Sequence, residues 1–297
     1  MKIAIASGKG GTGKTTIASN LASYLSSHGS DVTLVDCDVE EPNNHIFFQP
    51  KWHNSFQVQM PVPDVDASKC IGCGKCSEFC EFNAIVNVNN SILIFPELCH
   101  GCGGCFMICP TQALKETARG IGEVQQGIKN NLKIVHGVMR IGEAMSPPLI
   151  KKVKEHGSQS EISIIDCPPG TSCPMIQAVR GADFVLLVTE PTPFGLSDLK
   201  LAVETLRQLN LPFAVGVNRF EERGRTSLGD KPSKSKEYPH ETIHDYCKKE
   251  EIPIILEIPE DRAIAQAYSQ GKIFLEYLPH YENLFQNLMA DLEVLIC

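Results

Sequence analysis

The sequence has 297 residues, of which 42% are hydrophobic and 21% are charged, which excludes a wholly disordered chain and allows one large α/β domain with a small module. The formal net charge of −8 weighs against a nucleic acid as the main ligand. The first apolar run leads directly into a glycine-rich loop, which leaves no room for a signal peptide. No apolar run is long enough to span a bilayer, so we expect a soluble cytoplasmic protein.

Apolar runs that predict buried strands alternate with segments of helical periodicity along most of the chain. Residues 2–6 and 32–36 are expected strands, and residues 15–28 are an expected helix that Gly29 closes. After a cysteine-rich middle the same alternation returns. We therefore predict an α/β fold with a doubly wound, mostly parallel sheet that an insertion interrupts. The later expected strands are 162–166, 184–189, 213–218 and 252–258, with helices at 196–209 and 241–250.

The loop after the first expected strand reads Gly-Lys-Gly-Gly-Thr-Gly-Lys-Thr and fits the phosphate-loop pattern G-x-x-x-x-G-K-[ST] in full. Its glycines let backbone N–H groups converge on phosphate oxygens, and the following helix aims its N-terminus at the same anion. Lys14 adds a positive charge at the β- and γ-phosphates, and the Thr15 hydroxyl can ligate Mg²⁺. The expected nucleotide-binding residues of this loop are Gly8, Lys9, Gly10, Gly11, Thr12, Gly13, Lys14, Thr15 and Thr16.

The string from Lys9 to Thr15 resembles the deviant Walker A motif of the MinD/ParA/nitrogenase-iron-protein superfamily of P-loop NTPases. This resemblance implies that Lys9 reaches across a dimer to the partner's nucleotide and that ATP drives dimer closure. The segment Leu34-Val-Asp36-Cys-Asp38 is similar to the family's Asp-x-Asp segment. There the resemblance implies that Asp38 positions or polarises the attacking water and that Asp36 helps to organise the metal side.

Ile164-Ile-Asp166-Cys-Pro-Pro-Gly170 resembles the Walker B and switch II segment of the same family. Asp166, at the carboxyl end of a buried strand, is well placed to bind Mg²⁺ through water, and the Gly170 N–H can sense the γ-phosphate. The absence of an Asn-Lys-x-Asp signature favours ATP over GTP. The residues that resemble the family's base contacts are Asn218, Arg219, Pro259 and Asp261. The expected catalytic residues are Lys9, Lys14, Asp38 and Asp166, and the expected Mg²⁺ ligands are Thr15, Asp36, Asp38 and Asp166.

Eight of the thirteen cysteines form two copies of the spacing C-x₂-C-x₂-C-x₃-C, the pattern of bacterial two-cluster ferredoxins. In that pattern three closely spaced thiolates hold one face of a cluster and the fourth comes from the other group. Structural zinc is the alternative, but zinc sites have longer gaps between cysteine pairs. One [4Fe–4S] cluster is expected on Cys70, Cys73, Cys76 and Cys109, and the other on Cys80, Cys99, Cys102 and Cys105.

The whole chain resembles MinD-superfamily P-loop ATPases that contain an inserted α+β ferredoxin-like module. We expect residues 1–61 and 119–297 to form the ATPase domain and residues 62–118 the inserted module. The implied cofactors are ATP, Mg²⁺ and two [4Fe–4S] clusters. The sequence departs from the ferredoxin pattern at Glu81, which stands where the first motif usually has proline. We expect this residue to increase the hydration of that loop.

Three functions remain open on the sequence. The leading hypothesis is ATP-gated electron transfer to a redox protein partner, by a homodimer or a heterodimer with a paralogue. The second is a cluster assembly or transfer scaffold, although Mrp-type carriers have a C-x-x-C pair near the C-terminus and Cys247 and Cys297 stand alone here. The third is a MinD/ParA-like positioning ATPase, but the tail 281–297 has no Lys or Arg, so we expect neither stable membrane binding nor specific DNA binding.

Two features have weaker signals. Cys173 follows switch II, where the nitrogenase iron protein has a cluster nearby, but a free cysteine is more often a packing residue, and Cys37 and Cys167 are interpreted as packing. The polar segment 221–238 is interpreted as a surface loop, with a basic patch for an acidic partner as the alternative.

Overall fold

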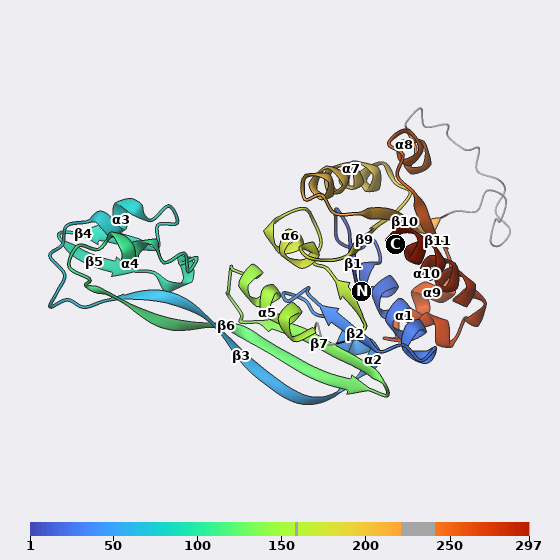
Figure 1. Ribbon diagram of the computed structural model, residues 1–297, viewed down its shortest axis with the longest axis horizontal. Coiled ribbons are helices and arrows are strands. Elements are labelled where there is room, and N and C mark those ends of the chain that lie inside the picture. Colours follow the sequence, from blue (N-terminus) through green and yellow to red (C-terminus); the bar gives the residue numbers. More distant parts are fainter. Residues whose placement is uncertain (158–159, 221–240, 297) are drawn as a thin grey trace.

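The computed structural model describes residues 1–157, 160–220 and 241–296. In these ranges a layered α/β domain carries a small module at the end of a long two-stranded ribbon (Figure 1). The predicted surface loop 221–238 and Cys297 lie outside the described residues.

The described strands of the α/β domain form one nine-stranded sheet in the order β11-β10-β9-β1-β8-β2-β7-β6-β3. The seven strands from β11 to β7 are parallel, and β6 and β3 are added antiparallel at one edge. The strands are β1 (Lys2–Ala6), β2 (Val32–Asp36), β3 (Lys51–Val65), β6 (Leu114–Lys129), β7 (Leu132–Met139), β8 (Ile162–Asp166), β9 (Phe184–Thr189), β10 (Phe213–Phe220) and β11 (Ile254–Pro259).

Helices cover both faces of this sheet, as a doubly wound fold requires (Figure 1). One apolar core includes buried side chains of α5 (Pro147–Gly157), α6 (Cys173–Val179), α7 (Pro193–Gln208) and α8 (Ile243–Lys249). The core on the other face includes side chains of α1 (Lys14–Ser27), α2 (Asn44–Phe48), α9 (Arg262–Ser269) and α10 (Glu282–Ile296). Because strands buried on both faces are apolar throughout, the sequence predicts them well.

The expected strands 2–6, 32–36, 162–166 and 184–189 are confirmed with the same bounds. The strands expected at 213–218 and 252–258 are present as Phe213–Phe220 and Ile254–Pro259. The C-terminal helix α10 packs on the sheet, where Phe285, Leu288 and Leu292 are fully buried. Burial of each such side chain stabilises the fold by about 2 kcal/mol. No helix within the described residues has the length and hydropathy of a membrane span.

Residues 59–65 of β3 and 114–121 of β6 continue beyond the rest of the sheet as a two-stranded ribbon, which we call the arm (Figure 1). The pairing of β6 with β7 ends at Gly122, and a register shift in the β3–β6 pair lies at the same place. Such a bulge bends a ribbon and increases its twist. The arm therefore begins at an irregularity, and the expected domain boundaries at 62 and 118 fall inside its two strands.

A buried ion pair fixes the root of the arm to the α/β domain. Arg119 of β6 contacts the carboxylate of Glu143 through both guanidinium Nη atoms. The Glu143 side chain is fully buried and also accepts hydrogen bonds from the backbone N–H groups of Ala144 and Met145. Charged groups this deeply buried need partners, so the pair holds the loop 140–146 against the arm.

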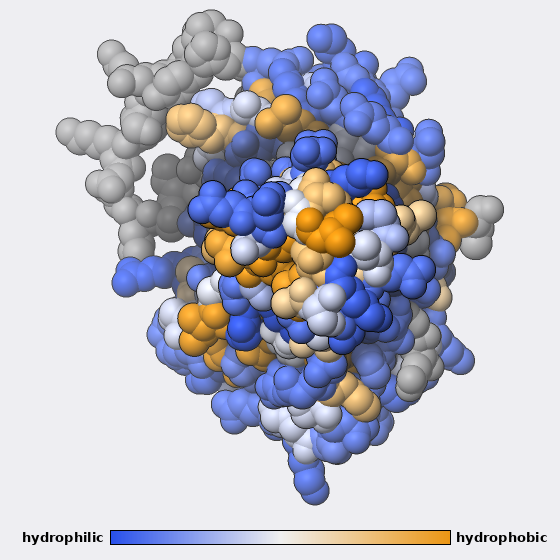
Figure 2. Space-filling model, turned by 90° about the vertical axis from the view of Figure 1, so that its left-hand side faces the viewer, coloured by the Kyte–Doolittle hydropathy of each residue, from blue (hydrophilic) through white to orange (hydrophobic). Residues whose placement is uncertain are grey.

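The module at the end of the arm repeats one unit twice. Its elements are α3 (Lys75–Phe79), β4 (Ile85–Val88), β5 (Ser91–Ile94) and α4 (Gly104–Ile108), and β4 and β5 form an antiparallel pair. The equivalent residues Gly74 and Gly103 precede α3 and α4 with φ of 76° and 75°, a left-handed conformation that suits glycine. Figure 2, which views the molecule from the module's end, shows apolar side chains exposed among hydrophilic ones.

Candidate functional site

The phosphate loop lies between β1 and α1, at the carboxyl edge of the parallel strands. Gly13 precedes α1 with a φ of 99°, and a Cβ atom there would come within 2.2 Å of Asn218 Nδ2. The Asn218 amide instead donates a 2.8 Å hydrogen bond to the carbonyl oxygen of Thr12. Glycine at this position therefore satisfies both the backbone conformation and the contact with the neighbouring strand β10.

Lys14 and the carboxylates of Asp38 and Asp166 meet at this edge of the sheet. Lys14 is 6% exposed, and its positive charge acts to lower the pKa values of Asp38 and Asp166. Burial is the stronger influence, because it raises the pKa of Asp38 to about 6 and also raises the pKa of Asp166. The nearby Thr15 hydroxyl acts to lower the pKa of Asp166. The structure thus brings together the expected Mg²⁺ ligands Thr15, Asp38 and Asp166.

Asp36 is surrounded by donors from the segment that follows it. Its Oδ1 accepts from the Asp38 N–H at 3.1 Å, and its Oδ2 accepts at 3.1 Å from the N–H groups of Asn43 and Asn44 and from the Asn44 side chain. Burial and the charge of Asp166 raise the pKa of Asp36 to about 8. These contacts agree with a residue that organises the 38–44 segment, whereas direct ligation of Mg²⁺ by Asp36 stays a prediction.

Several buried polar atoms at this site have no hydrogen-bond partner within the described protein. They include Thr12 Oγ1, Asp166 Oδ1 and Asn44 Oδ1. Buried polar atoms are normally paired, so such a group of unpaired atoms indicates that a ligand completes the site. A divalent cation with phosphate oxygens fits, because it would also offset the repulsion between neighbouring carboxylates.

The expected base-contacting residues lie at the carboxyl ends of β10 and β11. Asn218 is 8% exposed, and Arg219 has a left-handed φ of 58°. Both carboxylate oxygens of Asp261 have protein partners. Its Oδ1 caps α9 by accepting a hydrogen bond from Ala263 N–H, and its Oδ2 accepts one from the Tyr281 hydroxyl. Pro259 ends β11 opposite the end of β10. Their contacts with a base stay predictions.

Switch II begins at the end of β8. Gly170 has a φ of 91°, and its N–H donates to the Ser7 carbonyl oxygen at 3.1 Å. Cys173 is exposed at the first position of α6, so it is not the buried packing residue that a free cysteine usually is. Cys37 and Cys167 are fully buried in the apolar core, which confirms their interpretation as packing residues.

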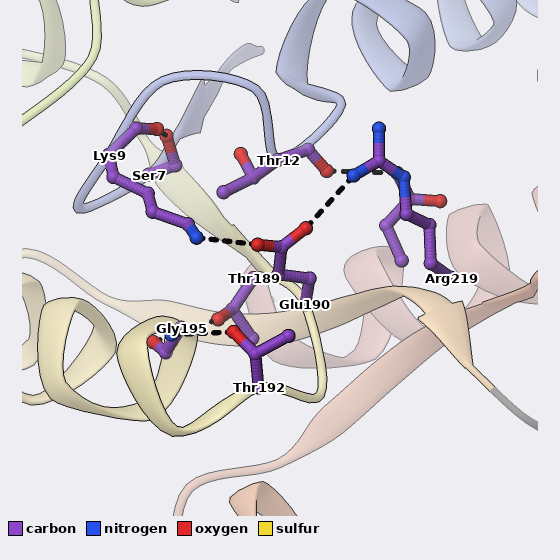
Figure 3. A network of polar contacts seen from close by, with 9 residues as sticks. Ser7, Lys9, Thr12, Thr189, Glu190, Thr192, Gly195 and Arg219 are labelled. Atoms are coloured by element: carbon purple, nitrogen blue, oxygen red, sulfur yellow. Dashed lines mark hydrogen bonds and ion pairs between the residues drawn. The ribbon is translucent and has the colours of Figure 1, made fainter.

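Two residues of this site were missed by the sequence analysis. Glu190 follows β9 and accepts a 2.5 Å hydrogen bond from Lys9 Nζ, while its other oxygen lies 3.0 Å from Arg219 Nη1 (Figure 3). Asn44 connects Asp36 and Asp166 through its side-chain amide. The position of Glu190 directly after a buried parallel strand was a usable signal, since functional groups gather at that edge. No sequence pattern distinguishes Asn44.

The eight central cysteines line two cavities in the module. The set Cys80, Cys99, Cys102 and Cys105 lines a cavity of about 390 Å³ together with Pro61, Phe79 and Phe82. The other set lines a narrower one beside Ile92 and Pro110. In each cavity three cysteines come from one group of the repeat and the fourth from the other. The sets are Cys70, Cys73, Cys76 and Cys109, and Cys80, Cys99, Cys102 and Cys105.

The thiol environment in these cavities suits a ligand that carries positive charge. Burial and the neighbouring Cys99 and Cys102 raise the pKa of Cys105 to about 11. Burial would also raise the pKa of Cys109, but hydrogen bonds from Ala113 N–H and the Thr111 hydroxyl outweigh it and lower that pKa. Gathered thiolates repel one another unless cations compensate them, and N–H groups directed at sulfur are typical of iron–sulfur sites.

These residues fit an iron–sulfur cluster by donor type, number and grouping. Within the described ranges, no three His, Cys, Asp or Glu side chains are close enough to hold a single metal ion. Ligation of two clusters by the eight cysteines therefore stays a prediction.

A contact path joins the nucleotide site to the beginning of β3, the strand whose last residues form one side of the arm. The helix α2 begins at Asn44 and is followed within three residues by β3. The His45 ring packs edge-on against His136 of β7 at 5.5 Å, and the Trp52 ring of β3 stacks on His136 at 4.4 Å. The helix that begins at Asn44 and the first residues of β3 thus pack on the same histidine of β7.

Comparison with known proteins agrees with the geometry of the phosphate loop. A family model described as the CobQ/CobB/MinD/ParA nucleotide binding domain matches residues 3–274. An uncharacterized protein of Methanocaldococcus jannaschii is 33% identical over 263 residues, which covers 88% of this chain and 87% of the relative. An iron-sulfur cluster carrier protein of Pyrococcus furiosus is 23% identical over 312 residues, which covers 98% of this chain and 88% of the relative.

Among solved structures, the septum site-determining protein MinD in complex with Mg-ADP from Pyrococcus horikoshii has a similar fold. The TM-score is 0.58 with 20% sequence identity, and the match covers 98% of this chain and 95% of that one. At this identity the likeness shows the mostly parallel α/β fold.

Proposed function

We propose that this chain, which belongs to the CobQ/CobB/MinD/ParA nucleotide-binding family, is an ATPase whose nucleotide state controls an iron–sulfur module. Lys14, Thr15 and Asp166 would hold Mg-ATP, Asp38 would orient the attacking water, and the eight cysteines would hold two [4Fe–4S] clusters. When bound, the clusters would supply one-electron chemistry, so the module would pass electrons to a redox partner.

One observation supports coupling between the two sites more than any other. Asn44 contacts both Asp36 and Asp166 at the phosphate site, and its helix is followed by β3, whose residues 59–65 form one strand of the arm. A segment that contacts the metal-binding carboxylates moves when a nucleotide and Mg²⁺ arrive. Because β3 is continuous with the arm, such a movement would change the orientation of the module.

The test measures how fast an iron chelator removes iron from the anaerobically prepared protein, with and without ATP. We expect ATP to change the rate several-fold in the natural protein and to have no effect in Lys14→Ala. Lys151→Ala, which removes an exposed lysine on α5, is the matched control and should behave as the natural protein does. Equal rates of iron removal with and without ATP in the natural protein would contradict coupling between the nucleotide site and the module.

Electron transfer is tested separately, by following ATP-dependent reduction of an oxidised viologen dye by the reduced protein. Delivery that persists unchanged in Lys14→Ala would rule out gating by ATP. Quantification of iron, sulfide and zinc in the same preparation decides between clusters and structural zinc.

A second candidate function is delivery of clusters to other proteins. It is favoured by the similarity to a relative named as an iron-sulfur cluster carrier protein. The missing C-x-x-C pair near the C-terminus weighs against it. Transfer of labelled iron and sulfide to an apo-ferredoxin, at a rate that depends on ATP, would establish this function instead.

A further inference from the structure

Lys9 and Lys14 belong to the same loop but face different partners. Lys14 is buried, and its charge acts on Asp38 and Asp166. Lys9 instead extends toward β9, where its Nζ donates to Glu190 Oε1 at 2.5 Å (Figure 3). The Lys9 ammonium therefore contacts Glu190, whereas the charge of Lys14 acts on Asp38 and Asp166.

Glu190 is held so that its carboxylate is shared between two cations. Its Oε2 lies 3.0 Å from Arg219 Nη1, and its side chain is 13% exposed. The turn after Glu190 is fixed, because Thr192 Oγ1 caps α7 by accepting from Gly195 N–H and Thr189 Oγ1 donates to the Gly195 carbonyl. A charge-assisted bond from a fixed carboxylate restricts a flexible lysine more than a bond between two mobile side chains.

The backbone of Lys9 is held as well. The buried Ser7 hydroxyl donates to the Lys9 carbonyl oxygen at 2.5 Å. On the other side of the loop, Gly8 packs so tightly on α7 that a Cβ atom would come within 2.2 Å of the Asp198 carbonyl oxygen. With its backbone held in this way, Lys9 can change the partner of its side chain without movement of the loop.

We propose that Glu190 is a positioning residue that holds Lys9 within its own chain until the nucleotide-bound dimer closes. This inference rests on the proposed function and on the role that the resemblance of the loop implies for Lys9, contact with the nucleotide of a second copy. Release of Lys9 leaves Glu190 paired with Arg219, so the carboxylate keeps one partner. The strength of the Lys9–Glu190 pair then sets the protein concentration at which ATP produces a dimer.

The test is the dimer dissociation constant with ATP, measured by sedimentation for the natural chain and for Glu190→Gln. The amide keeps the size of the side chain and removes its charge. Loss of one partly buried ion pair is worth roughly fivefold in an equilibrium constant, and since both copies must release Lys9, we expect the dissociation constant to fall about 25-fold. Glu250→Gln, which breaks the exposed 2.7 Å pair with Arg207, is the matched control and should leave the constant unchanged.

A second measurement tests the contact itself without ATP. Reductive methylation of Lys9, followed by mass spectrometry, should be several-fold faster in Glu190→Gln than in the natural chain. Equal methylation rates, or equal dimer constants, would overturn the role of Glu190. A large loss of ATP affinity in Glu190→Gln with an unchanged dimer constant would assign Glu190 to the nucleotide site and also overturn it.

Two results separate the role of Glu190 from the binding of ATP. A natural chain that binds no ATP would overturn the proposed function and this inference with it. A natural chain that binds ATP while neither it nor Glu190→Gln forms a dimer would overturn the role of Glu190 and leave ATP binding intact.

Discussion

The side-chain amide of Asn44 donates a 2.8 Å hydrogen bond to Asp166, which lies 122 residues further along the chain. The same amide also contacts Asp36 at 3.1 Å, so one buried side chain joins the ends of β2 and β8. Neighbouring carboxylates without such a donor would repel each other more strongly. This relationship makes Asn44 a structural link between the ends of these two strands.

Replacing Asn44 by alanine should destabilise the nucleotide-free protein. A buried carboxylate oxygen that loses its donor costs about 1–3 kcal/mol, and the free energy of unfolding in urea should fall by that amount. Asn283→Ala, on the exposed side of α10, is the control and should change it by less than about 0.5 kcal/mol. An unchanged midpoint for Asn44→Ala would show that the bridge contributes nothing to stability.

The stacked pair of Trp52 and His136 predicts a pH response. Burial and the charge of His45 lower the pKa of His136 to about 4, below the usual value near 6.5. The unfolded chain therefore binds more protons between those values, and this group's contribution to stability, about 2–3 kcal/mol, is lost as the pH falls through that window. Asp38 acts in the opposite sense, because its pKa is raised to about 6 and its contribution is lost as the pH rises.

The contribution of His136 is isolated by comparison with His136→Gln. The natural chain should lose more stability than the variant between pH 6.5 and pH 4. Trp52 is the sole tryptophan of the sequence, so its fluorescence reports the charge on the stacked imidazole directly. A fluorescence transition centred near pH 6.5 would contradict the burial that lowers this pKa.

The ion pair at the root of the arm should be sensitive to removal of one partner. Arg119→Met leaves the fully buried Glu143 carboxylate without its main partner, and we expect a loss of about 3 kcal/mol in the free energy of unfolding. Removing both charges, in Arg119→Met with Glu143→Leu, should recover most of this loss. Lys152→Met breaks an exposed pair with Glu155 and should cost less than about 1 kcal/mol. If Arg119→Met and Lys152→Met lower the free energy of unfolding equally, burial does not make the Arg119–Glu143 pair more important than an exposed pair.

The two cysteine sets predict that replacing the fourth cysteine of one group removes the cluster held mainly by the other group. Anaerobically prepared natural protein should hold about eight irons per chain, and either Cys80→Ser or Cys109→Ser should reduce this to about four. Each variant should keep the cluster of the other set, so their electron paramagnetic resonance spectra should differ. Cys247→Ser, at a buried position of α8, should retain all the iron. Zinc in place of iron in the natural protein would contradict the cluster proposal.

Much of the parallel sheet could be predicted from the sequence, because its strands are buried on both faces and therefore apolar throughout. The strands β3 and β6 could not, since most of β3 is exposed and carries polar residues. The glycine loop and the cysteine spacing are local patterns, so they indicate their residues directly. Glu190 and Lys9 are 181 residues apart, and only the order of strands in the sheet brings them together.

The arm also has a mechanical consequence. Its eight residues of β6 beyond Gly122 span about 25 Å at ~3.3 Å per residue. A two-stranded ribbon of this length acts as a lever, so a tilt of a few degrees at the bulge displaces the far end by more than an ångström. Small side-chain rearrangements beside Asp166 would then be amplified into a change in the gap between the module and whatever protein stands opposite it.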